Sequence, residues 1–333
     1  MKKILASSCL ILGLTGATSQ AYSAECGNLT IASMNWQSAE VLSNLDKIIL
    51  TEGYGCTADI IVGDTVPTIT SMAEKGQPDI APEAWIDLLP EAVSKGTEEG
   101  KIVQVGSPLP DGGIQGWYIP DYTAKAHPDI KTIPDLLKHP DLFPSADDSS
   151  KGAILNGPQG WGGTVTTAQL FKAMKAQEAN FTLVDTGSAA GLDGGVSKAY
   201  ERKQNVVAFY WEPTALLGKY PMVRLDPGVE HDEAEWKRCN TIADCPDPKP
   251  NAFPVDRIVS LVAKSSVDKL GPDAMSYLEK RSWSNETVSK LMAWMTDNQA
   301  SGEEGAKHFL KENQDLWTEW VSPEAAEKIK SSL

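Results

Sequence analysis

Short apolar runs alternate along this chain with segments in which apolar residues recur every three or four positions. The runs are typical of buried strands, and the recurring spacing is typical of amphipathic helices. In the first third we expect strands at 29–33, 58–62, 79–81 and 102–106, and helices at 38–51, 66–75 and 85–95. Strands and helices that alternate in this way predict an α/β fold with a largely parallel sheet.

The alternation starts again after a glycine-rich segment, 112–116, which we interpret as a flexible joint. Beyond it we expect strands at 117–119, 154–155, 181–184 and 206–210, and helices at 134–138, 164–176 and 196–202. This restart predicts a second domain, which a length of 333 residues also favours. A proline-rich segment, 226–256, comes next, followed by a strand at 255–263 and then by helices.

The first 24 residues have the order of a signal peptide. Lys2 and Lys3 precede an apolar run that is too short to span a bilayer, and small residues follow as far as Ala24. We expect cleavage after Ser23 or Ala24, and export of a soluble mature chain to the periplasm. The formal net charge of −15 argues against binding to nucleic acid or to anionic lipid.

Four cysteines follow the predicted signal peptide. An even number in an exported protein predicts two disulfides, although four cysteines allow three pairings. Cys239 and Cys245 are close in sequence, so we pair them, and this leaves Cys26 to pair with Cys56.

Tryptophan is unusually frequent, with ten residues against eight tyrosines and six phenylalanines. Five of them follow, open or end an expected strand; these are Trp36, Trp85, Trp117, Trp161 and Trp211. In open α/β sheets ligands bind outside the carboxyl ends of the strands. A box of indole faces suits a quaternary ammonium group, which cannot donate hydrogen bonds. The alternative is that each ring packs between the sheet and a helix, as we expect for Trp283, Trp294, Trp317 and Trp320.

Five motifs make the chain resemble the substrate-binding proteins of ABC importers for glycine betaine, choline and related osmolytes. They are NWQSAE at 35–40, DIAPEAW at 79–85, GWYIP at 116–120, GPQGWGG at 157–163 and AFYWEPT at 208–214. The resemblance implies a two-lobed periplasmic binding protein with a hinge and a ligand cleft between the lobes. Lobe 1 would comprise 25–116 and 215–333, and lobe 2 would comprise 117–214. It also implies a monomer that works with a membrane permease.

In such relatives an aromatic box holds the trimethylammonium head. On this chain the best matches are Trp36, Trp85, Trp161 and Trp211, with Trp117 next. In a strand Trp117 and Tyr118 would point to opposite faces, so only one of them can line the cleft.

The polar end of the ligand sets specificity. Backbone N–H groups of 160–163, before a helix, could bind an anion. The five motifs contain no Arg, Lys or His, which weakens a carboxylate ligand. Glu83 would attract a cationic head or a hydroxyl, or donate to an N-oxide if protonated; the alternative is a carboxylate that faces water at a helix start. We therefore rank trimethylamine N-oxide slightly above glycine betaine, with choline behind.

The proline-rich segment departs from the family pattern. Its predicted disulfide loop carries the oxygen donors Asn240, Thr241, Asp244 and Asp247, which suggest a structural calcium ion. The alternative is a solvated acidic turn, and we expect no other cofactor. A periplasmic hydrolase is the enzyme alternative, but the sequence has neither GxSxG nor HExxH, so we expect no enzyme.

Overall fold

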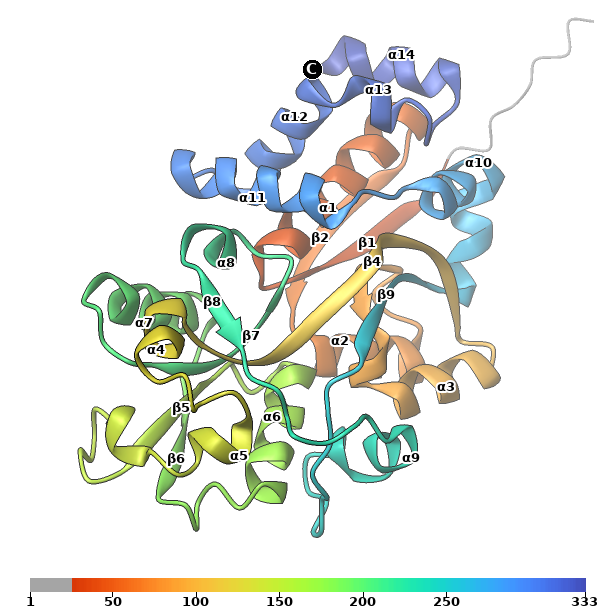
Figure 1. The fold of residues 1–333 in the computed structure, drawn as a ribbon. Coiled ribbons are helices and arrows are strands. Elements are labelled where there is room, and N and C mark those ends of the chain that lie inside the picture. Colours follow the sequence, from red (N-terminus) through yellow and green to blue (C-terminus); the bar gives the residue numbers. More distant parts are fainter. Residues whose placement is uncertain (1–25) are drawn as a thin grey trace, which may run out of the picture.

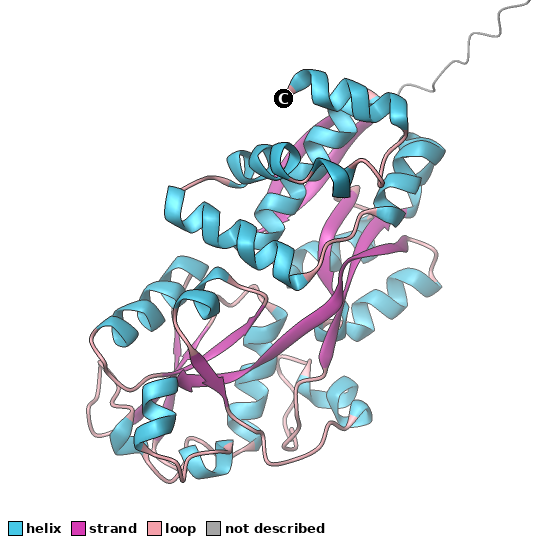
Figure 2. Cartoon of the chain, turned by 45° about the horizontal axis from the view of Figure 1, so that its top comes forward, coloured by secondary structure: helices cyan, strands magenta, loops and turns pink. Residues whose placement is uncertain are grey.

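The computed structural model describes residues 26–333, so the predicted signal peptide lies outside the described residues. In the described part of the chain, nine strands form one mixed sheet with helices around it (Figures 1 and 2). The strands are β1 (Asn28–Met34), β2 (Thr57–Gly63), β3 (Ile80–Trp85), β4 (Ile102–Pro120), β5 (Gly152–Asn156), β6 (Phe181–Asp185), β7 (Val207–Glu212), β8 (Met222–Arg224) and β9 (Val255–Ala263).

The strand order is β2-β1-β3-β9-β4-β7-β5-β6, with β8 beside β4. At one end β1 pairs in parallel with β2 and β3, and at the other β5 pairs in parallel with β6 and β7. Between them β4 is antiparallel to both β9 and β7. The expected α/β fold is therefore confirmed, but the sheet is mixed because β4 and β9 join two parallel units.

The helices gather into two lobes around these units (Figure 1). Around β1–β3 lie α1 (Gln37–Ile48), α2 (Thr65–Lys75), α3 (Pro90–Glu98), α10 (Val267–Lys280), α11 (Asn285–Asn298), α12 (Gly302–Glu312), α13 (Gln314–Trp317) and α14 (Pro323–Ser332). Around β5–β7 lie α4 (Asp121–Ala126), α5 (Ile133–Leu136), α6 (Gly162–Ala173), α7 (Ala189–Glu201) and α8 (Ala215–Lys219). The short α9 (Glu233–Glu235) belongs to the proline-rich segment, and the lobe boundaries that we drew in the sequence remain a prediction.

The glycine-rich segment 112–116 is not the flexible joint that we expected, because it lies inside β4. Its residues pair with β9 at Gly113 and Ile114 and with β7 from Ile114 onward. The pairing shifts register between Leu109 and Gly113, and Gly112 has a φ of 77°. A bulge of this kind bends a strand without ending it. One continuous strand thus carries the chain from the first lobe into the second.

Both predicted disulfides are present, Cys26–Cys56 and Cys239–Cys245. Among the described helices, none has the length and apolar character needed to cross a bilayer. Three of the four tryptophans that we assigned to packing are buried, namely Trp283, Trp317 and Trp320. Trp294 is half-buried and stacks on His308.

Candidate ligand-binding site

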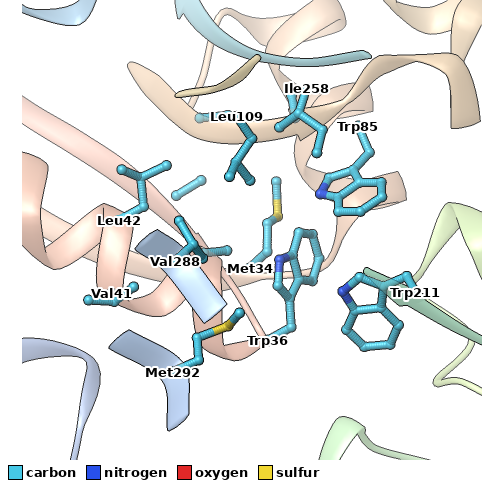
Figure 3. Close-up of a cluster of buried hydrophobic side chains, with 14 of the residues drawn as sticks. Met34, Trp36, Val41, Leu42, Trp85, Leu109, Trp211, Ile258, Val288 and Met292 are labelled. Carbon is cyan, nitrogen blue, oxygen red and sulfur yellow. The ribbon is translucent and has the colours of Figure 1, made fainter. Parts of the chain in front are cut away.

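Four tryptophans from different elements meet between the two lobes. Trp36 lies between β1 and α1, Trp85 ends β3, Trp161 directly precedes α6, and Trp211 lies near the end of β7. The rings of Trp36 and Trp161 are perpendicular with centroids 5.8 Å apart, and those of Trp161 and Trp211 are perpendicular at 5.0 Å. Figure 3 shows Trp36, Trp85 and Trp211 gathered beside the apolar core of the first lobe. These tryptophans are far apart in sequence, and their positions near strand ends bring them together in the fold.

These four rings line a cavity of about 30 Å³. The other lining residues are Thr65, Leu88, Gln115, Gly163 and Phe209. A single water needs about 10–15 Å³ of such space, so the cavity suits only a compact molecule in this conformation. Its lining contains no charged side chain. A buried aromatic surface of this kind favours a cation that is spread over methyl groups.

Gly113 makes room for the indole of Trp85. A methyl group built on Gly113 would lie 1.9 Å from Cζ3 of Trp85, far inside van der Waals contact. Glycine is therefore required here for the close approach of the ring rather than for a flexible hinge.

Glu83 holds two of the four indoles. Its Oε1 accepts hydrogen bonds from Nε1 of Trp36 at 2.7 Å, from Nε1 of Trp85 at 3.0 Å and from Oγ of Ser38 at 2.9 Å. The side chain is 1% exposed, and this burial raises the pKa of the carboxyl group. Glu83 does not line the cavity. It therefore orients the walls, a role that sequence reasoning did not assign.

Trp117 and Tyr118 are buried, and neither lines the cavity of the four tryptophans. Trp117 instead borders a separate hollow of about 80 Å³, together with Arg224 and Phe253. The Tyr118 hydroxyl donates to Oε1 of Glu212 at 3.3 Å. The structure thus does not bring Trp117 to the other four rings, and its contact with a ligand remains a prediction.

Sequence reasoning missed several residues that line the cavity, namely Thr65, Leu88, Gln115, Gly163 and Phe209. Two of them could have been identified from their positions in the sequence. Phe209 precedes Trp211 by two positions on β7, so both side chains lie on one face of the strand. Thr65 opens α2 two positions after the end of β2, and ligands also bind beyond such strand ends.

Two hydrogen bonds join the lobes at the edge of the cavity. Nε1 of Trp161 donates to Oδ1 of Asn35 at 2.5 Å. The backbone N–H of Val66 donates to the carbonyl of Gly160 at 3.0 Å. The lobes therefore meet across the site, as in a closed clamp.

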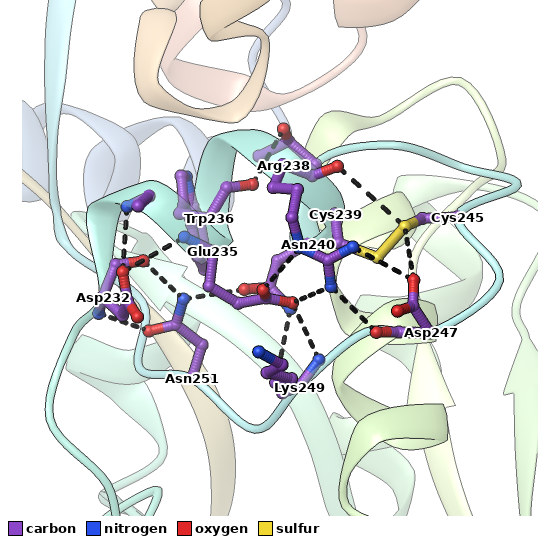
Figure 4. A network of polar contacts seen from close by, with 12 residues as sticks. Asp232, Glu235, Trp236, Arg238, Cys239, Asn240, Cys245, Asp247, Lys249 and Asn251 are labelled. Atoms are coloured by element: carbon purple, nitrogen blue, oxygen red, sulfur yellow. Dashed lines mark hydrogen bonds and ion pairs between the residues drawn. A yellow bond between two sulfur atoms is a disulfide. The ribbon is translucent and has the colours of Figure 1, made fainter.

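The predicted calcium loop is shown in Figure 4. Oδ1 of Asn240 accepts from Asn251, the hydroxyl of Thr241 donates to the carbonyl of Trp236, and Asp247 pairs with Arg238 at 3.0 Å. Calcium requires six to eight oxygen ligands that converge on one point. Three of the four donors are thus bonded to neighbours, whereas Asp244 is exposed. A calcium ion in this loop remains a prediction, and we derive no function from it.

The same segment connects the lobes. Nε1 of Trp236 donates to the carbonyl of Asp87 at 2.6 Å, and Nε2 of Gln169, in α6, donates to the carbonyl of Ile242 at 2.7 Å. The proline-rich segment therefore connects the first lobe to α6.

The family described as the substrate-binding domain of ABC-type glycine betaine transport systems matches residues 27–312. A trimethylamine N-oxide-binding protein of Pelagibacter ubique is 22% identical over 336 residues, which cover 96% of this chain and 99% of that protein.

Solved structures share the fold at low identity. A choline-binding protein of an ABC transporter, in complex with choline, has a TM-score of 0.71 and 19% identity over 92% of this chain and 98% of that chain. Lactococcal OpuAC, closed on glycine betaine, has a TM-score of 0.67 and 20% identity over 89% of this chain and 100% of that chain. The family match covers residues 27–312, and the two-lobed fold and the aromatic cavity are consistent with it. The chain therefore belongs to the family of substrate-binding domains of ABC-type glycine betaine transport systems.

Proposed function

We propose that the protein binds a small methylated amine in the cavity of Trp36, Trp85, Trp161 and Trp211 and delivers it to the permease of an ABC importer. The observation that carries the proposal is the set of four indoles around a compact cavity without charged side chains. A trimethylammonium group presents methyl surface and a diffuse positive charge, and indole faces attract both. We further propose that the protein acts in the periplasm as a monomer.

Cation–π contacts can supply most of the free energy that micromolar binding requires. A cation–π contact in a desolvated site contributes roughly 2 kcal/mol, so three contacts contribute about 6 kcal/mol. Micromolar affinity requires about 8 kcal/mol. Burial of the methyl groups and one polar contact would supply the difference.

Within this class we favour trimethylamine N-oxide. It is the most compact candidate for a cavity of about 30 Å³, and the relative from Pelagibacter ubique bears its name. The lining also contains no Arg, Lys or His to pair with the carboxylate of a betaine. Glycine betaine or choline is the second candidate, supported by the ligands of the choline-bound and betaine-bound neighbours.

Calorimetric titration of the mature protein with trimethylamine N-oxide, glycine betaine and choline tests the proposal. We expect micromolar binding of at least one compound with quenching of tryptophan fluorescence, and the tightest binding for trimethylamine N-oxide. Absence of binding to all three would contradict the proposal and leave the four tryptophans as packing residues.

A further inference from the structure

Gln115 is one of two polar side chains on the cavity wall, the other being Thr65. It lies in β4 opposite Trp211 of β7, and it is 3% exposed. Its Oε1 also lies close to Gly163, since a methyl group built on that glycine would be 2.8 Å from this atom. The amide therefore sits between the wall formed by Trp211 and the first turn of α6.

Asp256 fixes the far side of this amide. It lies in β9 and is fully buried, and its Oδ2 accepts from Nε2 of Gln115 at 3.0 Å. Its Oδ1 accepts from the backbone N–H of Asp87 at 3.2 Å. A buried carboxyl group needs hydrogen-bond partners, and Asp256 satisfies this requirement partly with Gln115. One end of the amide is thus held while the other remains at the cavity.

We propose that Gln115 contacts the polar end of the ligand and determines specificity, and that Asp256 is the residue that positions its amide. The inference rests on the proposed function, because it assumes that the methylated head lies among the indoles. A ligand held there by its methyl groups must place its remaining substituent against the lining, and Gln115 offers that substituent a buried hydrogen-bonding group.

The pair can serve an acceptor such as an N-oxide oxygen. That oxygen only accepts hydrogen bonds, so the amide must turn its N–H groups toward the cavity and its oxygen toward Asp256. A protonated Asp256 permits this arrangement, because its O–H then donates to Oε1 of Gln115. Burial, together with the nearby charge of Asp87, raises the pKa of Asp256 well above its ordinary value. Protonation of Asp256 therefore favours the orientation in which the N–H groups of Gln115 face the cavity.

Tetramethylammonium is a probe of this contact, because a methyl group replaces the oxygen of trimethylamine N-oxide. Tetramethylammonium has a net positive charge and the N-oxide has none, so the contribution of Gln115 is the change in their relative affinity between the wild-type protein and a variant. Gln115→Met keeps the size of the side chain and removes the amide. We expect it to lower the affinity for the N-oxide relative to tetramethylammonium about tenfold, since one buried hydrogen bond to a charged oxygen is worth about that factor.

Further variants separate positioning from packing. Asp256→Asn retains groups that bond to Gln115 and should keep the wild-type relative affinity for the N-oxide, whereas Asp256→Ala should lower it. Gln104→Met is a matched control, because Gln104 lies on the same strand with an exposed side chain and should leave the relative affinity unchanged. Thermal melts identify any variant that fails to fold, and Gln115→Leu then replaces Gln115→Met.

The outcomes are distinct. An equal change in the affinities for both compounds in Gln115→Met, or no change in either, would overturn the role of Gln115. An unchanged relative affinity in Asp256→Ala would overturn the positioning role of Asp256. Wild-type protein that binds neither these compounds nor glycine betaine or choline would overturn the proposed function itself.

Discussion

Trp161 and Asn35 are 126 positions apart, yet Nε1 of the indole donates to Oδ1 of the amide at 2.5 Å. Asn35 directly follows β1, and Trp161 directly precedes α6, so this bond joins the two lobes at the cavity edge. The contact both orients one wall of the box and favours the closed arrangement. We therefore expect closure and recognition to be linked through this side-chain pair.

Asn35→Ala should weaken ligand binding about five- to tenfold, because one hydrogen bond contributes about 1 kcal/mol and a buried indole N–H is left unpaired. The loss should appear mainly as faster dissociation, measured by stopped-flow tryptophan fluorescence. Asn44→Ala is the control, since the amide of Asn44 donates to the carbonyl of Glu40 in its own helix. Unchanged dissociation in Asn35→Ala would contradict the link between this bond and the closed state.

Trp211→Ala tests whether this ring is a wall of the site or part of the core. Trp211 lines the cavity and is 8% exposed. We expect about 2 kcal/mol of lost binding, about thirtyfold in Kd, in a protein that still folds. Calorimetry and thermal melting measure the two effects, with Trp294→Ala as the control outside the cavity. Unfolding of most molecules, with full affinity in the folded remainder, would identify Trp211 as a core residue.

Gly113→Ala should displace the indole of Trp85, because the added methyl group would lie 1.9 Å from the ring. We expect at least a tenfold loss of affinity and altered tryptophan fluorescence in the ligand-free protein. Gly194→Ala is the matched control: it lies in α7 with nothing within 4 Å of the added carbon, and its helix should gain stability. Equal affinity of the two variants would show that Trp85 need not stay in place for binding.

The sequence predicted much of this site for one physical reason. Strands of a parallel unit present their carboxyl ends at one edge, and Trp36, Trp85 and Trp161 follow or end such strands. This reasoning does not apply to β4, because β4 is an antiparallel strand that continues through both lobes. Trp117 lies in β4, and the structure places it away from the other four rings.

Gln115 was missed for a related reason. It lies in a glycine-rich segment that suggested a loop, whereas Gly113 is needed there to admit Trp85. The orienting role of Glu83 was hidden because every residue of β3 is buried, so no alternation revealed which side chains share a face.

Glu83→Ala should impair binding because it releases the indoles of Trp36 and Trp85, and not because it removes a direct contact with the ligand. The change leaves the N–H groups of Trp36 and Trp85 and the hydroxyl of Ser38 without their acceptor. We expect at least a tenfold loss of affinity and roughly 2–4 kcal/mol of lost stability. Glu83→Gln retains an acceptor oxygen and should bind nearly as well as the wild-type protein. A strong loss in Glu83→Gln with normal stability would instead indicate that the carboxyl group acts on the ligand.

Asp256 should make the free energy of unfolding depend on pH. Its pKa is raised in the folded protein by burial first and by the charge of Asp87 second. The hydrogen bond from the Asp87 backbone, the charge of Arg257 and the hydrogen bond from Gln115 oppose this shift. The folded state therefore keeps a proton that the unfolded state releases above its ordinary pKa near 4. Since the folded state binds more protons there, stability falls as pH rises from about 4 through the raised pKa.

Denaturant unfolding of the wild-type protein and of Asp256→Asn, from pH 4 to pH 8, measures this contribution. The stability of the wild-type protein relative to Asp256→Asn should be greatest at pH 4 and should decline as pH rises, because the asparagine does not titrate. Arg257 and Asp87 are present in both proteins, so their direct contributions largely cancel in the difference. A difference that stays constant or grows with pH would show that Asp256 is charged in the folded protein. Gln115 would then be held with its N–H groups on the carboxylate and its oxygen toward the ligand.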